Sequence, residues 1–226
     1  MESPPDPKTA VRDAATTIIL RDDAVLMGQR GKSAAFMPGK FVFPGGAVDV
    51  VDKSVPVKGI DPKVAHQLSL ESQLTPETLI ATAARELWEE TGQILGTPET
   101  WDTPPDGWKG FAKTGHVPNG AACSLFFRAV TPKGRPRRFD ARFILAHANA
   151  LITDPDDFSG AEEELSHIQW VPLKDARKFD LPFITKVVLA EIVTYLESGE
   201  IADPPFFRND DERHLVSRLA GRDPLA

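Results

Sequence analysis

The chain has 226 residues, 41% of them hydrophobic, a length and composition that favour one elaborated domain with a sizeable core over two small domains. Its formal net charge of −7, from 33 acidic and 26 basic residues, argues against binding of nucleic acid or anionic membrane through overall charge. Cys123 is the only cysteine, which excludes an intrachain disulfide and a cysteine-based zinc site. Without a leader peptide or a membrane-spanning run, the sequence predicts a soluble, cytoplasmic protein.

The first part of the chain predicts a tail followed by short strands. Residues 1–10 are rich in proline and predict a flexible tail. Two apolar, β-branched runs, 14–20 and 24–29, predict a β-hairpin. Residues 41–43 predict a strand that ends at Pro44-Gly45-Gly46, because this tripeptide favours a turn. The segment 49–74 has no clear periodicity and predicts an insertion with a short helix near residues 62–70.

A strong helix start follows this segment. Thr75 is a good N-cap residue, proline follows in the first turn, and Glu77 lies near the positive end of the helix dipole. Gly92 is a typical stop signal. The sequence therefore predicts a helix over Pro76–Thr91.

The rest of the chain alternates between strand and helix patterns. Strands are predicted at residues 121–130, 139–146 and 166–171, and helical segments at 173–179 and 182–196. We find no internal repeat. This order predicts a single domain over residues 11–226 of the α/β (α+β) class, with a mixed sheet sandwiched between helices.

The helix over Pro76–Thr91 carries three carboxylates on one face. Glu86, Glu89 and Glu90 are spaced i, i+3 and i+4, which places them within an arc of roughly 100°. Such like charges repel unless water or a cation compensates them, and Mg²⁺ prefers a few carboxylates, several waters and substrate phosphates. A solvated surface is the usual interpretation of an isolated acidic pair, but the complete pattern of glutamates, arginine and glycine favours a metal site.

This pattern resembles the Nudix box, in which a glutamate, Arg-Glu, an apolar residue, Glu-Glu, a glycine and a second apolar residue recur at fixed spacing. The match runs without exception from Glu77 to Ile94. The family's upstream glycine would fall at position 71, which is Glu here, so we identify it with Gly45 or Gly46, displaced by the insertion 49–74.

The resemblance implies the Nudix fold and a divalent cation, Mg²⁺ or Mn²⁺, held by Glu86, Glu89 and Glu90. A backbone carbonyl of Gly45 or Gly46 would help to bind the cation. Arg85 would orient Glu86, and Glu77 would be a structural partner of Arg85.

The resemblance leaves the general base open. Glu90 is one candidate, and Glu162, Glu163 and Glu164 are others, because an acid in the loop before residues 166–171 often faces the box in this family. For each of these three, a solvated loop position is the more ordinary interpretation.

The implied activity is hydrolysis of a nucleoside diphosphate linked to another moiety. Looser similarities, around residues 13–46 and 137–143, resemble coenzyme A diphosphatases, which would cleave coenzyme A or acyl-coenzyme A into 3',5'-ADP and a phosphopantetheine product. Arg30, Arg138 and Arg142 are then candidates for substrate binding, because arginine suits phosphate. Trp101 and Trp108 could stack on a base, although packing is the more ordinary role.

Several alternatives stay open at this level. The substrate could be ADP-ribose, NADH or a similar nucleotide. The chain could instead be a non-catalytic module that senses a nucleotide, or use the fold as an isomerase or a DNA-repair accessory. A homodimer is expected by analogy with the family.

Overall fold

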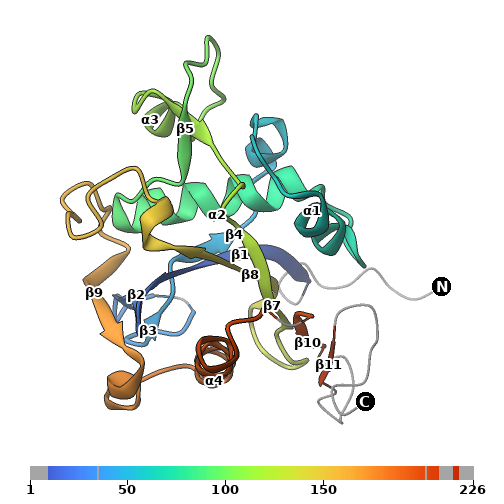
Figure 1. Ribbon diagram of the computed structural model, residues 1–226, viewed down its shortest axis with the longest axis vertical. Coiled ribbons are helices and arrows are strands. Elements are labelled where there is room, and N and C mark those ends of the chain that lie inside the picture. Colours follow the sequence, from blue (N-terminus) through green and yellow to red (C-terminus); the bar gives the residue numbers. More distant parts are fainter. Residues whose placement is uncertain (1–9, 35, 202, 209–215, 219–226) are drawn as a thin grey trace.

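The computed structural model describes residues 10–34, 36–201, 203–208 and 216–218. Within these ranges a nine-stranded mixed sheet runs in the order β11-β10-β7-β8-β1-β2-β3, with β4 paired to β1 and β9 paired to β2 (Figure 1). The strands are β1 (Val11–Arg21), β2 (Ala24–Arg30), β3 (Phe41–Val42), β4 (Gly45–Ala47), β7 (Ser124–Val130), β8 (Arg138–His147), β9 (Leu165–Pro172), β10 (Pro205–Phe207) and β11 (Val216–Arg218).

The helices are α1 (Pro62–Ser69), α2 (Pro76–Thr91), α3 (Lys109–Ala112) and α4 (Phe183–Ser198). Short 3-10 helices lie at η1 (Val50–Ser54), η2 (Ala148–Ala150) and η3 (Leu173–Lys178). A small second sheet pairs β5 (Gly96–Pro98) with β6 (His116–Pro118). Together with α3 it forms an arm, residues 96–118, that projects beyond α2 (Figure 1).

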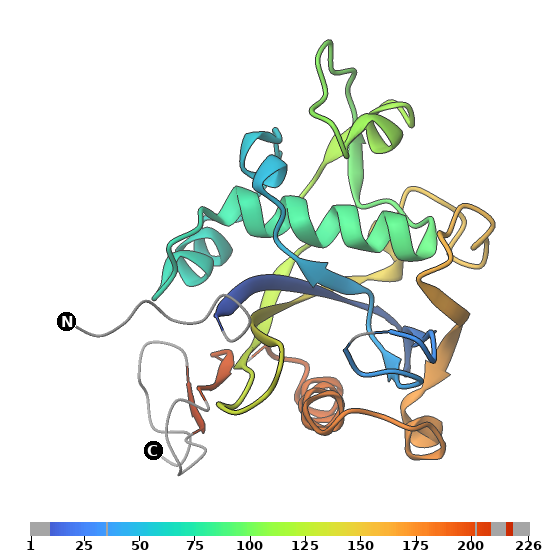
Figure 2. The same cartoon turned by 180° about the vertical axis from the view of Figure 1, so that it is seen from behind.

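The sheet lies between α2 on one face and α4 on the other (Figure 2). Alternation along β1 supplies both faces: Ala15 and Ile19 pack in the cluster that contains α2, and Ile18 and Leu20 pack in the cluster that contains α4. All four side chains are almost fully buried. This two-sided burial explains why β1 is a nearly continuous apolar run.

The helix α2 begins and ends where the sequence predicts. The hydroxyl of Thr75 accepts a hydrogen bond of 3.2 Å from the amide of Thr78, Pro76 follows the cap, and Gly92 ends the helix with φ of 75°. The buried hydroxyl of Thr17 in β1 donates to the carbonyl of Ala83 at 3.0 Å. The apolar face of α2 is thereby fixed on β1, and its carboxylates lie on a different face of the helix.

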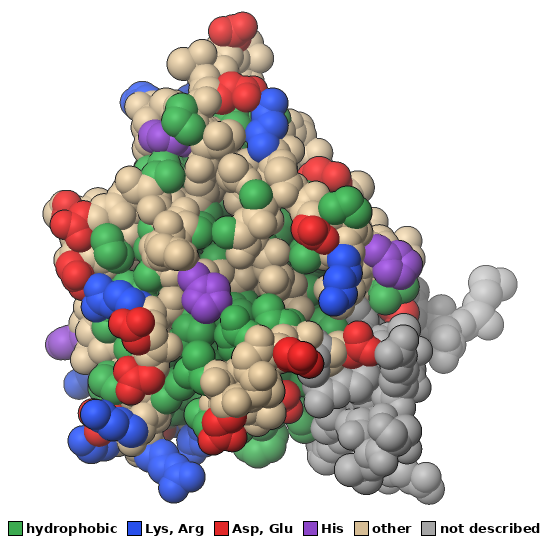
Figure 3. All heavy atoms as spheres, viewed as in Figure 1, with side chains coloured by type: hydrophobic (Ala, Val, Ile, Leu, Met, Phe, Trp, Pro, Cys, Tyr) green, Lys and Arg blue, Asp and Glu red, His purple; other side chains and the backbone are tan. Residues whose placement is uncertain are grey.

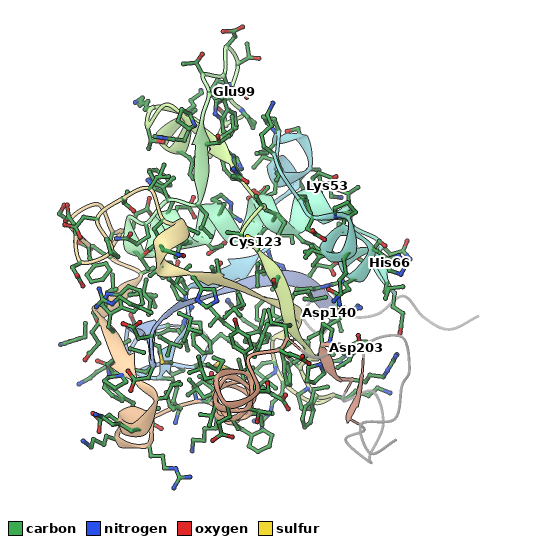
Figure 4. All side chains as sticks on the ribbon, in the orientation of Figure 1. Lys53, His66, Glu99, Cys123, Asp140 and Asp203 are labelled. Atoms are coloured by element: carbon green, nitrogen blue, oxygen red, sulfur yellow. The ribbon has the colours of Figure 1, made fainter. Side chains whose placement is uncertain are left out.

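Most of the predicted elements are confirmed. The predicted hairpin is β1 and β2, and the short helix near 62–70 is α1. Cys123, which lies just before β7 (Figure 4), is buried. Of the helical segment predicted at 173–179, Leu173–Lys178 forms a 3-10 helix instead of a regular one. No helix of the described ranges is long and apolar enough to cross a membrane.

One local prediction was wrong. Pro44-Gly45-Gly46 does not simply turn away from the sheet, because Gly45–Ala47 pairs antiparallel with residues 14–16 of β1. A Cβ on Gly45 would lie 2.6 Å from the carbonyl oxygen of Ala15, so glycine permits a close approach that other residues would prevent. The predicted tail over residues 1–10 lies, apart from residue 10, outside the described residues, and the single domain over 11–226 stays a prediction.

On the face of the molecule shown in Figure 3, Lys and Arg side chains of the described residues are interspersed with Asp and Glu side chains. This face therefore does not present a field of one sign.

Candidate active site

Two glycines of β4 lie directly against the carboxylates of α2. The amide of Gly45 donates a hydrogen bond of 2.7 Å to Oε2 of Glu90. A Cβ on Gly46 would stand 2.4 Å from Oε2 of Glu86. Because neither glycine has a side chain, the backbone of β4 can approach the carboxylate face of the helix closely.

Arg85 joins two of the three carboxylates. Its Nη1 donates to Glu86 at 2.8 Å and to Glu89 at 2.9 Å, and its Nη2 donates to the carbonyl of Ala47 at 3.1 Å. Arg85 would orient Glu86 through this contact, and that role stays a prediction.

The predicted structural partner of Arg85 was wrong. Glu77 is exposed in the first turn of α2, whereas the guanidinium pairs with Asp52 of η1 at 3.0 Å. A second hydrogen bond of 3.0 Å joins Nη2 of Arg85 to the same carboxylate. The sequence held one local signal for this turn, the spacing of Asp49 and Asp52, which form a capping box. That signal predicts a helical turn but does not reveal its contact with Arg85.

Glu90 faces a cation and a further acid. Its Oε1 lies 3.8 Å from Nη1 of Arg30, and Nη2 of Arg30 donates to Oε1 of Glu164 at 2.6 Å. Glu90 is 2% exposed, and its Oε1 has no hydrogen-bond partner within the described residues. Nε of Arg30 is buried without a partner as well. The region between Glu90 and Arg30 is thus short of hydrogen bonds.

Burial raises the pKa of all three helix carboxylates. For Glu86, burial outweighs the opposing charge of Arg85 and raises the pKa to about 7. The pKa of Glu89 is also raised by burial, against the effect of Arg85. The pKa of Glu90 is well above its ordinary value because of burial and the neighbouring charge of Glu86. The raised pKa values mean that the charged forms of these three carboxylates are costly in the protein. A bound cation would offset this cost.

The residues present fit a divalent cation. Glu90 offers a buried oxygen without a partner, Glu86 and Glu89 lie one turn apart on its helix face, and Gly46 leaves the approach to Glu86 open. No three His, Cys, Asp or Glu side chains within the described ranges converge closely enough to hold a metal ion as they stand. Glu86 and Glu89 instead point to Arg85, so binding would require one or both to turn away from it.

The acidic loop before β9 reaches the helix at particular positions. The amide of Glu162 donates to the carbonyl of Glu89 at 2.7 Å, and the charge of Glu162 contributes to the raised pKa of Glu89. Glu164 contacts Arg30 and contributes to the raised pKa of both Glu86 and Glu90. Glu163 is exposed and is not among the largest causes of the raised pKa of the helix carboxylates.

The match to a known family covers most of the chain. Residues 11–192 match the NUDIX domain. The chain belongs to the Nudix family. It is 30% identical over 177 residues to the protein named "Putative nudix hydrolase 7" of Caenorhabditis elegans, and the match covers 70% of this chain and 52% of that protein. The chain thus spans about half the length of this curated relative.

Solved structures show the same Nudix fold. A Nudix hydrolase from Alicyclobacillus acidocaldarius is similar with a TM-score of 0.62 at 25% identity, over 86% of this chain and 99% of that one. A MutT protein from Methanosarcina mazei Go1 is similar with a TM-score of 0.50 at 15% identity, over 86% of this chain and 100% of that one. The predicted fold class is confirmed by the first of these structures.

Two arginines expected to bind substrate in this Nudix protein lie elsewhere. Arg142 is 2% exposed and forms ion pairs with Asp13 and with Asp140. Asp140 is labelled in Figure 4. Its Nη2 donates to the hydroxyl of Ser72, in the loop before α2, at 3.3 Å. Nε of Arg138 donates to the carbonyl of Thr131 in the adjacent turn. Arg142 is therefore occupied inside the protein, whereas Arg30 lies beside the carboxylates of α2.

The tryptophans serve packing. Trp108 is fully buried, and its ring contacts Phe111 and Trp101 with centroids 5.2 and 5.6 Å apart. Its indole N–H donates to Asp52 at 2.9 Å, and that of Trp101 donates to the carbonyl of His116 at 2.7 Å. Stacking of Trp108 on a nucleotide base is therefore excluded by its burial.

Proposed function

We propose that this Nudix protein is a divalent-metal-dependent pyrophosphohydrolase of nucleoside diphosphate-linked compounds. The observation that carries the proposal is the buried carboxylate of Glu90, with one oxygen held by Gly45 and the other without a hydrogen-bond partner beside Arg30. A buried acid in this state is costly for a fold unless a ligand completes it.

Glu86, Glu89 and Glu90 would hold the Mg²⁺ or Mn²⁺, with a carbonyl of Gly45 or Gly46. A bound divalent cation neutralises the charge of a pyrophosphate and lowers the pKa of a bound water. Arg85 orients Glu86 and Glu89 through its Nη1. Arg30 is well placed for a phosphate, because its guanidinium already lies among acids and has an unused buried N–H.

For the general base we favour Glu164 over Glu163, with Glu90 as the other candidate. Glu164 is partly exposed, which lets it accept and release a proton, and its charge reaches both Glu86 and Glu90. The buried Glu90 is better suited to a ligand role, since Gly45 and the helix fix its position.

The substrate within this class is a finer proposal. Coenzyme A or acyl-coenzyme A, cleaved to 3',5'-ADP and a phosphopantetheine product, is supported by the sequence similarities around Arg30 and the insertion 49–74. Arg142 does not support the coenzyme A assignment, because its guanidinium is buried in ion pairs with Asp13 and Asp140. ADP-ribose, NADH or another nucleotide is the alternative. A non-catalytic nucleotide sensor is less favoured, because all the carboxylates of the box are present. A cytoplasmic location and a homodimer stay predictions.

A product screen with Mg²⁺ and Mn²⁺ tests the proposal. The substrates would be coenzyme A, acetyl-coenzyme A, ADP-ribose, NADH, diadenosine polyphosphates and nucleoside triphosphates, with Glu90→Gln as the matched inactive protein. Release of 3',5'-ADP would support the coenzyme A assignment, and another preferred substrate would replace it. Binding of a nucleotide without cleavage of any compound would favour the sensor and overturn the hydrolase.

A further inference from the structure

Asp52 lies at the centre of a buried network that ends at the carboxylates of α2. It is 1% exposed. Its Oδ1 accepts hydrogen bonds from Nε of Arg85 at 3.0 Å and from the indole of Trp108 at 2.9 Å. Its Oδ2 accepts from Nη2 of Arg85 at 3.0 Å, the hydroxyl of Thr82 at 2.8 Å and the amide of Asp49 at 2.9 Å. Arg85 and Thr82 lie on α2, Asp49 is the N-cap of η1, and Trp108 is the N-cap of α3. The donors to Asp52 therefore come from three elements of the fold.

We propose that Asp52 is the positioning residue that aims Arg85, and through it Glu86 and Glu89, in the metal site. The proposal rests on the proposed function, because it concerns the affinity of the same carboxylates for a cation. Asp52 accepts hydrogen bonds of 3.0 Å from both Nε and Nη2 of Arg85. The remaining nitrogen, Nη1, donates to Glu86 and Glu89. The box position Glu77 does not take part, since it is exposed at the other end of the helix.

The two hydrogen bonds to Asp52 fix the orientation of the Arg85 guanidinium. A guanidinium that pairs with a carboxylate through two parallel N–H groups is held in one plane, whereas a single contact would let it rotate. Free of Asp52, Arg85 could use several N–H groups on Glu86 and Glu89 and compete with a cation for their oxygens. Burial alone would raise the pKa of Asp52, but the hydrogen bonds and charge of Arg85, together with the hydrogen bonds from the Asp49 amide and the Trp108 indole, keep the pKa below its ordinary value. Asp52 therefore remains charged opposite Arg85.

The position of Asp52 depends in turn on the arm of residues 96–118. Trp108 is fully buried in a small cluster with Phe111, Val55 and Ala81 of α2. Its indole donates to Oδ1 of Asp52, whereas the amide of Asp49 donates to Oδ2. The segment after β4 and the arm thus enclose one carboxylate between them, and both contribute to the geometry of Arg85.

The test measures binding of Mn²⁺ alone to the full-length protein by titration calorimetry, and then kcat and KM at saturating metal. Three variants are compared with the wild type. Asp52→Asn removes the charge and the paired hydrogen bonds with the guanidinium, Trp108→Phe removes one hydrogen bond but keeps the charge and an aromatic ring, and Glu77→Gln is the matched control. Circular dichroism and thermal melting establish that each variant is folded.

We expect Asp52→Asn to weaken Mn²⁺ binding about tenfold or more, as for other residues that orient metal ligands, with kcat reduced and KM within about twofold of wild type. Trp108→Phe should weaken binding about threefold, a smaller effect for one lost hydrogen bond. Glu77→Gln should bind as the wild type does.

Wild-type affinity in folded Asp52→Asn would overturn the inference, as would an equal loss in Glu77→Gln. If Asp52→Asn does not fold, Trp108→Phe decides, and wild-type affinity in that variant overturns the inference. A wild-type protein that binds no Mn²⁺ would overturn the proposed function itself, which distinguishes the two failures.

Discussion

The backbone amide of Gly45 donates a 2.7 Å hydrogen bond to one oxygen of Glu90, while the other oxygen of that carboxylate is buried without a hydrogen-bond partner. The same carboxylate has a pKa raised well above the ordinary value by burial and by the charge of Glu86. The protein thus maintains a buried acid in an incomplete environment, which costs stability and is typical of a binding site.

Glu90→Gln should separate activity from stability. Glutamine keeps the shape and can still accept from Gly45, but it is a poor ligand for Mg²⁺, so turnover should fall by about 100-fold or more. Because a neutral side chain avoids the cost of burying a charge, metal-free Glu90→Gln should melt at or above the wild-type temperature at pH 8. Turnover with Mg²⁺ and melting in a chelator check the two halves, and near-normal metal-dependent turnover would contradict the role of Glu90.

The two glycines of β4 should respond differently to alanine. The three atoms nearest to a Cβ at Gly46 all belong to the carboxylate of Glu86, a side-chain end that can move, so Gly46→Ala should fold and bind Mn²⁺ about tenfold more weakly. A Cβ at Gly45 meets the backbone of Ala15 and Thr16 at 2.6 Å, so Gly45→Ala should lower the free energy of unfolding by about 3 kcal/mol or more. Denaturant unfolding and Mn²⁺ titration distinguish the two variants, and equal loss of stability in both would contradict this division.

The sequence alone was sufficient for α2 and its carboxylates because their signals are local. Thr75, Pro76 and Gly92 mark the helix ends, and the 3.6-residue period places Glu86, Glu89 and Glu90 on one face. Local patterns also predict the hairpin of β1 and β2. These elements depend on residues within one helix turn or one strand of each other.

The contacts of Asp52 and Trp108 could not be predicted in this way. Asp52 lies 33 residues before Arg85 and 56 before Trp108 in sequence, and its segment has no periodicity that indicates burial. The same applies to Arg142, whose partner Asp13 is 129 residues distant. An arginine in a basic stretch resembles a phosphate-binding residue until its long-range partners are known.

Stability in the absence of metal should fall as the pH rises. A carboxyl with a higher pKa in the folded chain binds protons more tightly there, so the free energy of unfolding decreases between the ordinary pKa of 4.5 and the value of about 7 for Glu86. Glu89 and Glu90 act in the same direction. A divalent cation compensates these charges, so Mg²⁺ should raise the melting temperature more at pH 8 than at pH 5.

Melting curves across this range, with Mg²⁺ or with a chelator, measure the difference. Glu90→Gln serves as the control and should show a smaller dependence on pH. A shift by Mg²⁺ that is equal at pH 5 and pH 8 would count against the site.

Arg142 and Arg30 should have different roles, although the sequence predicts substrate binding for both. Arg142→Met removes a buried guanidinium that pairs with Asp13 and Asp140, although Asp140 keeps its ion pair with Arg128, and should lower the free energy of unfolding by about 2 kcal/mol. Arg30→Met removes the cation beside Glu90 and should raise KM about tenfold for a phosphate-bearing substrate. Unfolding curves and initial rates settle the matter, and a specific KM effect in a stable Arg142→Met would restore its substrate role.

Glu164 and its neighbour Glu163 offer a matched pair for the general base. Both are exposed in the same loop, but Glu164 accepts a hydrogen bond of 2.6 Å from Arg30. The charge of Glu164 also contributes to the raised pKa of Glu86 and Glu90. Glu164→Gln keeps a hydrogen-bond acceptor for Arg30 but cannot take a proton, so kcat should fall about 100-fold with KM little changed. Glu163→Gln should stay within about twofold of wild type, because its exposed side chain takes no part in the hydrogen bonds and ion pairs that Arg30 and the helix carboxylates form within the described residues.

The pH profile distinguishes a base from a residue that only holds Arg30. If Glu164 takes the proton, the acidic limb of kcat should flatten in Glu164→Gln, since that limb reports protonation of the base. If it only positions Arg30, kcat should keep its acidic limb and KM should rise, as in Arg30→Met. Equal losses in Glu163→Gln and Glu164→Gln would remove both roles, and the base would then be sought in Glu90, whose buried carboxylate already lies at the centre of the site.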